Sequence, residues 1–229
     1  MLTAAEWGIV ALSLQVGGVA VLVTLPLAFA LAFLLARGRF PGKVLLDGVI
    51  HLPLVVPPVV TGWLLLLAFA PAGPIGGWLE SWFGISVLFR WTGAALAAGV
   101  MALPLMVRAM RLSIEAVDRR LEDAAATLGA GRWRVFRTIT LPLSLPGVIA
   151  GAVLGFARAL GEFGATITFV SNVPGETETL PLAIYAALQV PGGEGMVLRL
   201  ALMSVALSLA ALVASELIAR RAGRGLHVL

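Results

Sequence analysis

The sequence predicts an all-α, polytopic membrane protein, and three observations support this fold class. The mean hydropathy is +1.02, and only 12% of the 229 residues are charged, against about 25% in soluble domains. Several apolar stretches are long enough to cross a bilayer, which takes about 20 helical residues. The basic residues gather between these stretches. Because so little polar surface cannot coat a globular protein in water, we expect a single transmembrane domain over residues 1–229.

Short loops join five candidate transmembrane helices. They cover residues 8–36, 48–70, 91–107, 145–166 and 200–218. The second stretch carries three prolines, so we expect a kink in it. The apolar stretch 180–190 is too short to span a bilayer and is expected to form an interfacial or re-entrant helix.

The positions of the basic residues predict how the helices are oriented. Most of the 16 basic residues lie in three segments: Arg37, Arg39 and Lys43, then Arg108, Arg111, Arg119, Arg120, Arg132, Arg134 and Arg137, and finally Arg220, Arg221 and Arg224. Basic loops favour the cytoplasmic side of a membrane. We therefore expect an outside N-terminus and a cytoplasmic C-terminus. The net charge of +4 belongs to this topology, and no nucleic-acid partner is expected.

The longest cytoplasmic segment, residues 108–144, contains the most charged part of the chain. One apolar face is predicted there, with residues at spacings of three and four: Ile114, Val117, Leu121, Ala124, Ala125 and Leu128. The pattern predicts a helix over 113–128 that ends at Gly129, and a second short helix over 133–139 that stops at Pro142. These residues alone leave two interpretations open: a docking platform, or a surface loop whose charges only set the topology.

The same segment contains a longer motif, LEDAAATLGAGRWRVFRTITLP, from Leu121 to Pro142. Its acidic residue, two alanines, glycine and final I-x-L-P resemble the EAA loop of ABC-transporter permeases. The resemblance implies a type I ABC importer permease fold and a coupling helix that docks on an ATP-binding subunit. The residues implied in coupling are Glu122, Asp123, Ala124, Ala125, Gly129, Ala130, Arg132 and Pro142. Asp123 stands at the family's glutamate position and Glu122 precedes it, so either acid is a candidate for that role.

Other stretches resemble the molybdate permeases of that family. They are FPGKVLLDGVIHLPLVVPPVVTG at 40–62, FARALGEFGATITFVSNVPGETETLP at 156–181 and QVPGGE at 189–194. The resemblance implies transport of an oxyanion, namely molybdate and possibly tungstate, across a bacterial cytoplasmic membrane by alternating access. Sulfate and thiosulfate permeases share RALGEFG and are the alternative within the family. An ion-coupled carrier or a channel is the alternative outside it.

The sequence also indicates where the energy for transport comes from. It has no GxxxxGK[ST] phosphate loop, so we expect no enzymatic activity in this chain, with ATP and Mg²⁺ bound by a partner subunit. With no cysteine and two histidines, no metal site or cofactor is expected. The resemblance implies a permease homodimer, two ATP-binding subunits, an extracytoplasmic molybdate-binding protein and surrounding membrane lipid.

Two charged residues lie inside the predicted fourth span. Arg158 and Glu162 are four residues apart, so they share one helix face. Charges within a membrane usually face a partner or a water-filled path. They are either a structural pair at a dimer interface or part of the translocation path near a gate. The nearby candidates for that path are Gly164, Thr166 and Thr168. The hydroxyls of the two threonines either reach an oxyanion or bond to their own backbone.

Overall fold

The computed structural model describes residues 3–226, together with the side chains of residues 3–214 and of Leu217. All regular structure in this part of the chain is helical. The elements are α1 (Ala4–Arg37), α2 (Lys43–Val55), α3 (Pro58–Phe69), α4 (Gly76–Phe83), α5 (Trp91–Ala116), α6 (Arg119–Thr127), α7 (Arg132–Val135), η1 (Phe136–Thr140), α8 (Leu141–Leu160), α9 (Gly164–Val170), α10 (Leu180–Leu188) and α11 (Glu194–Leu226).

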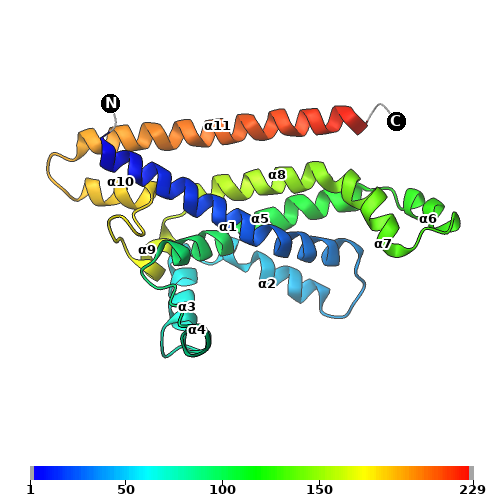
Figure 1. Ribbon diagram of the computed structural model, residues 1–229, viewed down its shortest axis with the longest axis horizontal. Helices are drawn as coiled ribbons and strands as arrows, with labels where there is room; N and C mark the ends of the chain where they lie inside the picture. The colour runs from blue at the N-terminus through cyan, green and yellow to red at the C-terminus, as the bar shows by residue number, and fades with distance from the viewer. Residues whose placement is uncertain (1–2, 227–229) are drawn as a thin grey trace.

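The core of the molecule is formed by α1, α5 and α8, which run side by side along the long axis (Figure 1). Small residues on α5 are fully buried against α1, and larger methionines fill the spaces near its C-terminal half. Gly155 of α8 lies so close to α5 that an added Cβ would be 2.6 Å from the sulfur of Met106. Such close contact between helices is typical of membrane bundles, where packing replaces the hydrophobic effect.

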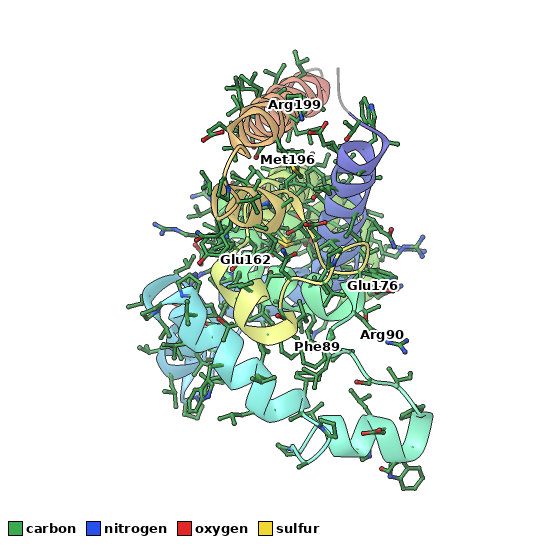
Figure 2. The ribbon with its side chains drawn as sticks, turned by 90° about the vertical axis from the view of Figure 1, so that its left-hand side faces the viewer. Phe89, Arg90, Glu162, Glu176, Met196 and Arg199 are labelled. Atoms are coloured by element: carbon green, nitrogen blue, oxygen red, sulfur yellow. The ribbon has the colours of Figure 1, made fainter. Side chains whose placement is uncertain are left out.

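Among the described residues, four helices are long and apolar enough to cross a membrane: Ala4–Arg37, Trp91–Ala116, Arg132–Leu160 and Glu194–Ala214. A fifth span is formed if α2 and α3 count together, although they are bent by 113°. The expectation of one kinked helix over 48–70 is therefore corrected. Neither Pro57 nor Pro58 can donate a backbone hydrogen bond, so α2 ends at Val55 and α3 starts with Pro58 in its first turn. Figure 2 shows α3 and α4 extending away from the helical body.

The expected span over 145–166 also has different limits. Helix α8 ends at Leu160, and α9 begins only at Gly164. Glu162 lies between them, where its Oε1 accepts a hydrogen bond of 2.8 Å from the backbone N–H of Ala165. This carboxylate satisfies a free N–H at the start of α9, which favours a new helix over continuation of α8.

Two helix limits near the charged segment are corrected as well. The expected helix over 113–128 is interrupted, because α5 continues to Ala116 and Asp118 caps a separate helix, α6, by accepting from the N–H of Arg120 at 2.9 Å. The expected stop at Pro142 is absent. The chain is helical from Arg132 to Leu160, with a π-helical segment at Phe136–Thr140. There the N–H of Leu141 bonds to the carbonyl of Phe136, and this wider turn accommodates the proline that follows.

The last helix, α11, begins earlier than the expected span over 200–218, at Glu194. Its start lies beside the start of α1 (Figure 1). There Arg199 donates to both carboxylate oxygens of the buried Glu6, at 2.7 and 3.3 Å. The hydroxyl of Ser13 accepts from the N–H of Leu180 at 2.7 Å, which attaches α10 to α1. The short helix expected over 180–190 is α10.

Candidate functional site

Helix α6 belongs to the charged segment 108–144 and lies at one end of the molecule, near the C-terminal end of α1 (Figure 1). None of the α6 residues is fully buried, and Leu121 and the following Leu128 are 50% and 89% exposed. Gly129 has φ +83°, which confirms the expected helix end at this glycine. The result is a short helix with exposed apolar and alanine side chains, a surface suited to contact with another protein.

Glu122 has its carboxylate directed inward. Its Oε1 is 2.9 Å from Nη2 of Arg37, at the end of α1, and accepts a hydrogen bond of 2.6 Å from the hydroxyl of Thr140. Arg37 also donates to the carbonyl of Val117 at 3.3 Å. The side chains of Arg37 and Glu122 are only 14% and 20% exposed. Glu122 therefore connects α6 to α1 and to η1, which leads directly into α8.

Asp123 has different surroundings from its neighbour. It is exposed and makes no hydrogen bond or ion pair with any described side chain. It lines a groove of about 1000 Å³ together with Ala126, Ala130 and Arg132. Of the two acidic residues that the sequence left as alternatives, one is used inside the chain and the other is accessible from outside.

The second candidate site is the pair Arg158 and Glu162. Arg158 Nη2 lies 2.6 Å from Glu162 Oε2, which confirms the expected contact. The Glu162 side chain is 1% exposed and lies inside the helical body (Figure 2), whereas that of Arg158 is 26% exposed. Through its other oxygen, Oε1, the buried carboxylate accepts a hydrogen bond from the N–H of Ala165, so only the guanidinium of the pair is partly accessible.

The residues expected beside this pair have mainly structural contacts. Thr168 donates its hydroxyl to the carbonyl of Gly164 at 2.9 Å, one of the two expected possibilities, and Thr166 is buried. A Cβ on Gly164 would lie 2.8 Å from Cβ of Pro58, so this glycine allows α9 to pack against α3. The ring of Phe163 is 5.0 Å from that of Tyr185 on α10.

Helix α8 connects the two sites. The segment that holds Thr140 and contacts Glu122 precedes it, and Arg158 lies in its last turn. At 1.5 Å per residue, the 20 residues of α8 extend about 30 Å. A continuous helix therefore connects the contact between Glu122 and Thr140 to the pair Arg158 and Glu162.

Two charged groups were not identified from the sequence. Arg111 contacts Asp47 at 3.1 Å and Glu115 at 2.8 Å, and His51 Nδ1 lies 3.3 Å from Asp47, which joins α2 to α5. The four-residue spacings within each helix were the available signal. The other group is the pair formed by Glu6 and Arg199, which are 193 residues apart in the sequence. In the described part of the chain, no group of three or more histidine, cysteine, aspartate or glutamate side chains is arranged to hold a metal ion.

Known proteins resemble this chain over almost its entire length. The molybdenum transport system permease protein ModB of Escherichia coli K12 is 60% identical over 228 residues, which cover 98% of this chain and all of that protein. The ModB protein of Haemophilus influenzae is 60% identical over 92% of both chains. The sulfate transport system permease protein CysT of Escherichia coli K12 is 40% identical over 69% of this chain and 57% of that protein.

Solved structures show the same fold at low sequence identity. A bacterial alginate ABC transporter, in complex with its alginate-bound periplasmic protein, matches with a TM-score of 0.76 and 17% identity over 96% of this chain and 80% of that chain. The MetNI methionine ABC transporter matches with a TM-score of 0.67 and 16% identity over 95% and 94%. The fold of this chain is thus that of an ABC importer permease.

A family model confirms the relationship. The model for binding-protein-dependent transport system inner membrane components matches residues 16–224. Together with the apolar helices, the match indicates a multi-pass protein of the inner membrane. The chain belongs to the family of binding-protein-dependent transport system inner membrane components.

Proposed function

We propose that this chain is the permease subunit of an ABC importer that carries molybdate, and also tungstate, into the cell. The observation that carries the proposal is the 60% identity to molybdenum permeases over nearly the full length. The sulfate permease CysT of Escherichia coli K12 is 40% identical over 69% of this chain. The active assembly contains two copies of the permease, two ATP-binding subunits that bind ATP and Mg²⁺, and an extracytoplasmic molybdate-binding protein.

The exposed helix α6 docks on the ATP-binding subunit in this proposal. Asp123, Ala124 and Ala125 face the partner, and the turn at Gly129 and Ala130 completes the contact, while Arg132 lies beside this turn in the lining of a groove. The exposure of α6 and the absence of a phosphate loop from the sequence support this assignment. The N-terminus then lies outside and the C-terminus in the cytoplasm.

Glu122 acts as a positioning residue in the same proposal. It does not contact the ATP-binding subunit but attaches α6 to Arg37 of α1 and to Thr140 before α8. When ATP closes the two ATP-binding subunits, α6 moves with them, and these contacts transmit its displacement to the transmembrane helices. Pro142 and the π-helical segment set the direction in which α8 leaves the coupling region.

Arg158 attracts the oxyanion as it passes along the translocation path between the two permease copies. Its guanidinium is partly exposed, while the buried Glu162 balances its charge. An attraction that is partly neutralised lets the substrate leave again, as a permeation path requires. Gly164, Thr166 and Thr168 shape this region through packing.

ATP-dependent uptake in reconstituted vesicles tests the proposed function. Vesicles that contain the permease and its ATP-binding subunit receive the binding protein, ATP and either molybdate, tungstate or sulfate. We expect uptake of molybdate and tungstate that requires both ATP and the binding protein, with much slower uptake of sulfate. Preferential uptake of sulfate would assign the chain to the sulfate branch, and uptake without ATP would indicate a carrier or channel.

A further inference from the structure

A groove of about 1000 Å³ lies between the C-terminal half of α1 and the segments α6, α7 and η1. Aromatic side chains form its walls. The ring of Phe136 lies 6.1 Å from Phe29, 5.4 Å from Phe33 and 5.2 Å from Trp133. Arg37, Arg119 and Arg132 also line the groove. It therefore combines an apolar interior with several guanidinium groups.

The groove opens onto an apolar face of α1. Val23, Leu27 and Leu34 are 69%, 54% and 43% exposed, and Ala30 lies on the same face and lines the groove. Their spacings of four, three and four residues place them in one stripe. Because α1 has no charged residue between Glu6 and Arg37, this stripe lies at the depth of the hydrocarbon.

The depth of each part of the groove follows from its distance to Arg37, the last residue of α1. Phe33 and Phe29 precede it by one and two helical turns, about 6 and 12 Å at 1.5 Å per residue. The aromatic walls thus lie at the level of lipid chains, and the arginines lie at the level of the headgroups. Trp133 is 68% exposed, as expected for an indole at a membrane interface.

The charges at the opening favour an anion. Arg37 is paired with Glu122, whereas Arg119 and Arg132 have no carboxylate within ion-pair distance among the described side chains. Asp123 is the one other acidic residue in the groove lining, so the lining carries one net positive charge. Guanidinium groups bind phosphate through paired hydrogen bonds.

We propose that this groove binds one anionic phospholipid, with its phosphate at Arg119 and Arg132 and an acyl chain against Phe29, Phe33 and Phe136. The lipid fills the space between α1 and the segments α6, α7 and η1. It thereby adds a second connection between them, besides the contact between Arg37 and Glu122. The proposal needs the membrane location of the chain and a groove that stays open when the ATP-binding subunit docks on α6. It does not depend on which oxyanion is transported.

Quenching of tryptophan fluorescence tests the site. The full chain is reconstituted in phosphatidylcholine vesicles with an equal fraction of brominated phosphatidylglycerol or brominated phosphatidylcholine. The contribution of Trp133 is the difference between the wild type and Trp133→Phe. We expect brominated phosphatidylglycerol to quench it more strongly. This preference corresponds to a higher affinity of the groove for phosphatidylglycerol than for phosphatidylcholine. In Arg119→Gln/Arg132→Gln the ratio of the two affinities should fall about fivefold for each arginine removed.

A matched variant separates this site from general attraction to anionic lipid. Arg39→Gln/Lys43→Gln removes two positive charges from the adjacent loop, outside the groove, and should keep the preference. Equal quenching of Trp133 by both lipids would overturn the proposal, and so would an unchanged preference in Arg119→Gln/Arg132→Gln. Loss of the quenching when the ATP-binding subunit is added would also overturn it, because the groove would then belong to that protein partner.

Discussion

Two adjacent acidic residues of α6 differ in what they contact. Glu122 is mostly buried and holds Arg37 and Thr140, whereas Asp123 is exposed without a partner among the described side chains. A hydrogen bond to a charged group contributes about 1.5–3 kcal/mol to stability, so the contacts of Glu122 stabilise the position of α6 against α1. This contrast assigns different tasks to the two residues in the proposed coupling mechanism.

Replacement of Glu122 by glutamine should loosen α6 without removing it from the ATP-binding subunit. The change removes the charge that attracts Arg37, so we expect the opening free energy of residues 119–127 to fall by about 1.5–3 kcal/mol. Amide hydrogen exchange in this segment measures the change. The ATP-binding subunit should still copurify, while the number of oxyanions transported per ATP should fall.

Two further variants complete this test. Asp123→Asn removes no contact within the chain, so it should leave the exchange unchanged and weaken copurification. The reversed pair Arg37→Glu/Glu122→Arg should restore the slow exchange. Unchanged exchange in Glu122→Gln would show that its contacts do not hold α6.

Replacement of Arg158 by a neutral residue should destabilise the protein, because the buried carboxylate of Glu162 then has no positive charge beside it. Arg158→Gln leaves Glu162 charged and 1% exposed. Breaking a buried pair in this way costs about 3–5 kcal/mol, and somewhat less here because Arg158 is partly exposed. We therefore expect the thermal midpoint in detergent to be lower for Arg158→Gln than for Arg158→Gln/Glu162→Gln.

The same variants test the role of the pair in transport. The double variant should assemble with the ATP-binding subunit and show reduced uptake, since no cation then attracts the oxyanion. Wild-type uptake by the double variant would mean that the pair is structural only.

At the scale of elements, the close contact between α5 and α8 depends on glycines of α8. An added Cβ at Gly147 would overlap the side chain of Ser113 and lie 3.1 Å from the carbonyl oxygen of Ala109. Gly151 and Gly155 follow at intervals of one turn and face Met110 and Met106. These three glycines let the helix that connects the two candidate sites lie directly against α5.

Gly147→Ala should therefore destabilise the protein by about 1–3 kcal/mol, the usual effect of overpacking. Gly18→Ala is the matched control, because Gly18 is also within a long helix but has no atom within 4 Å of its added Cβ. The control should be neutral or slightly stabilising, since alanine favours helix over glycine. Thermal midpoints in detergent compare the two, and equal midpoints would contradict the packing argument.

At the scale of the whole molecule, different contacts hold the two ends of the bundle. At one end, Glu6 with Arg199 and Ser13 with Leu180 attach α1 to α11 and α10. At the other end, Glu122 joins α1 to α6 and η1. Helix α8 runs from Leu141, directly after Thr140, to the region of Arg158 and Glu162. In the proposed mechanism, this arrangement would carry movement at α6 along α8 to Arg158 and Glu162.

Several features followed from local sequence patterns. Long apolar stretches predicted the helices of the bundle, because a membrane demands helices of that length whatever their neighbours are. Gly129 predicted the end of α6, since a left-handed residue after a helix favours glycine. The pair Arg158 and Glu162 followed from its spacing of four residues.

Other predictions were wrong where distant contacts or unusual turns compete with local preference. The stop at Pro142 was wrong because a π-helical turn accommodates the proline. The single kinked helix over 48–70 was wrong: the stretch forms two helices bent by 113°, and α3 packs against α9, where an added Cβ on Gly62 would lie 2.5 Å from the carbonyl oxygen of Ala165. Neither the wide turn nor this distant neighbour can be recognised in the local sequence.

The sequence by itself determined the membrane class, the helical content, the position of the charged segment 108–144 and the family to which the chain belongs. These properties depend on composition, periodicity and short motifs, which are local. Only the tertiary structure decided that Glu122 is bound to Arg37 while Asp123 is accessible, and that Glu6 pairs with Arg199. These contacts join residues that are 85 and 193 positions apart, and such pairings arise only when the helices pack together.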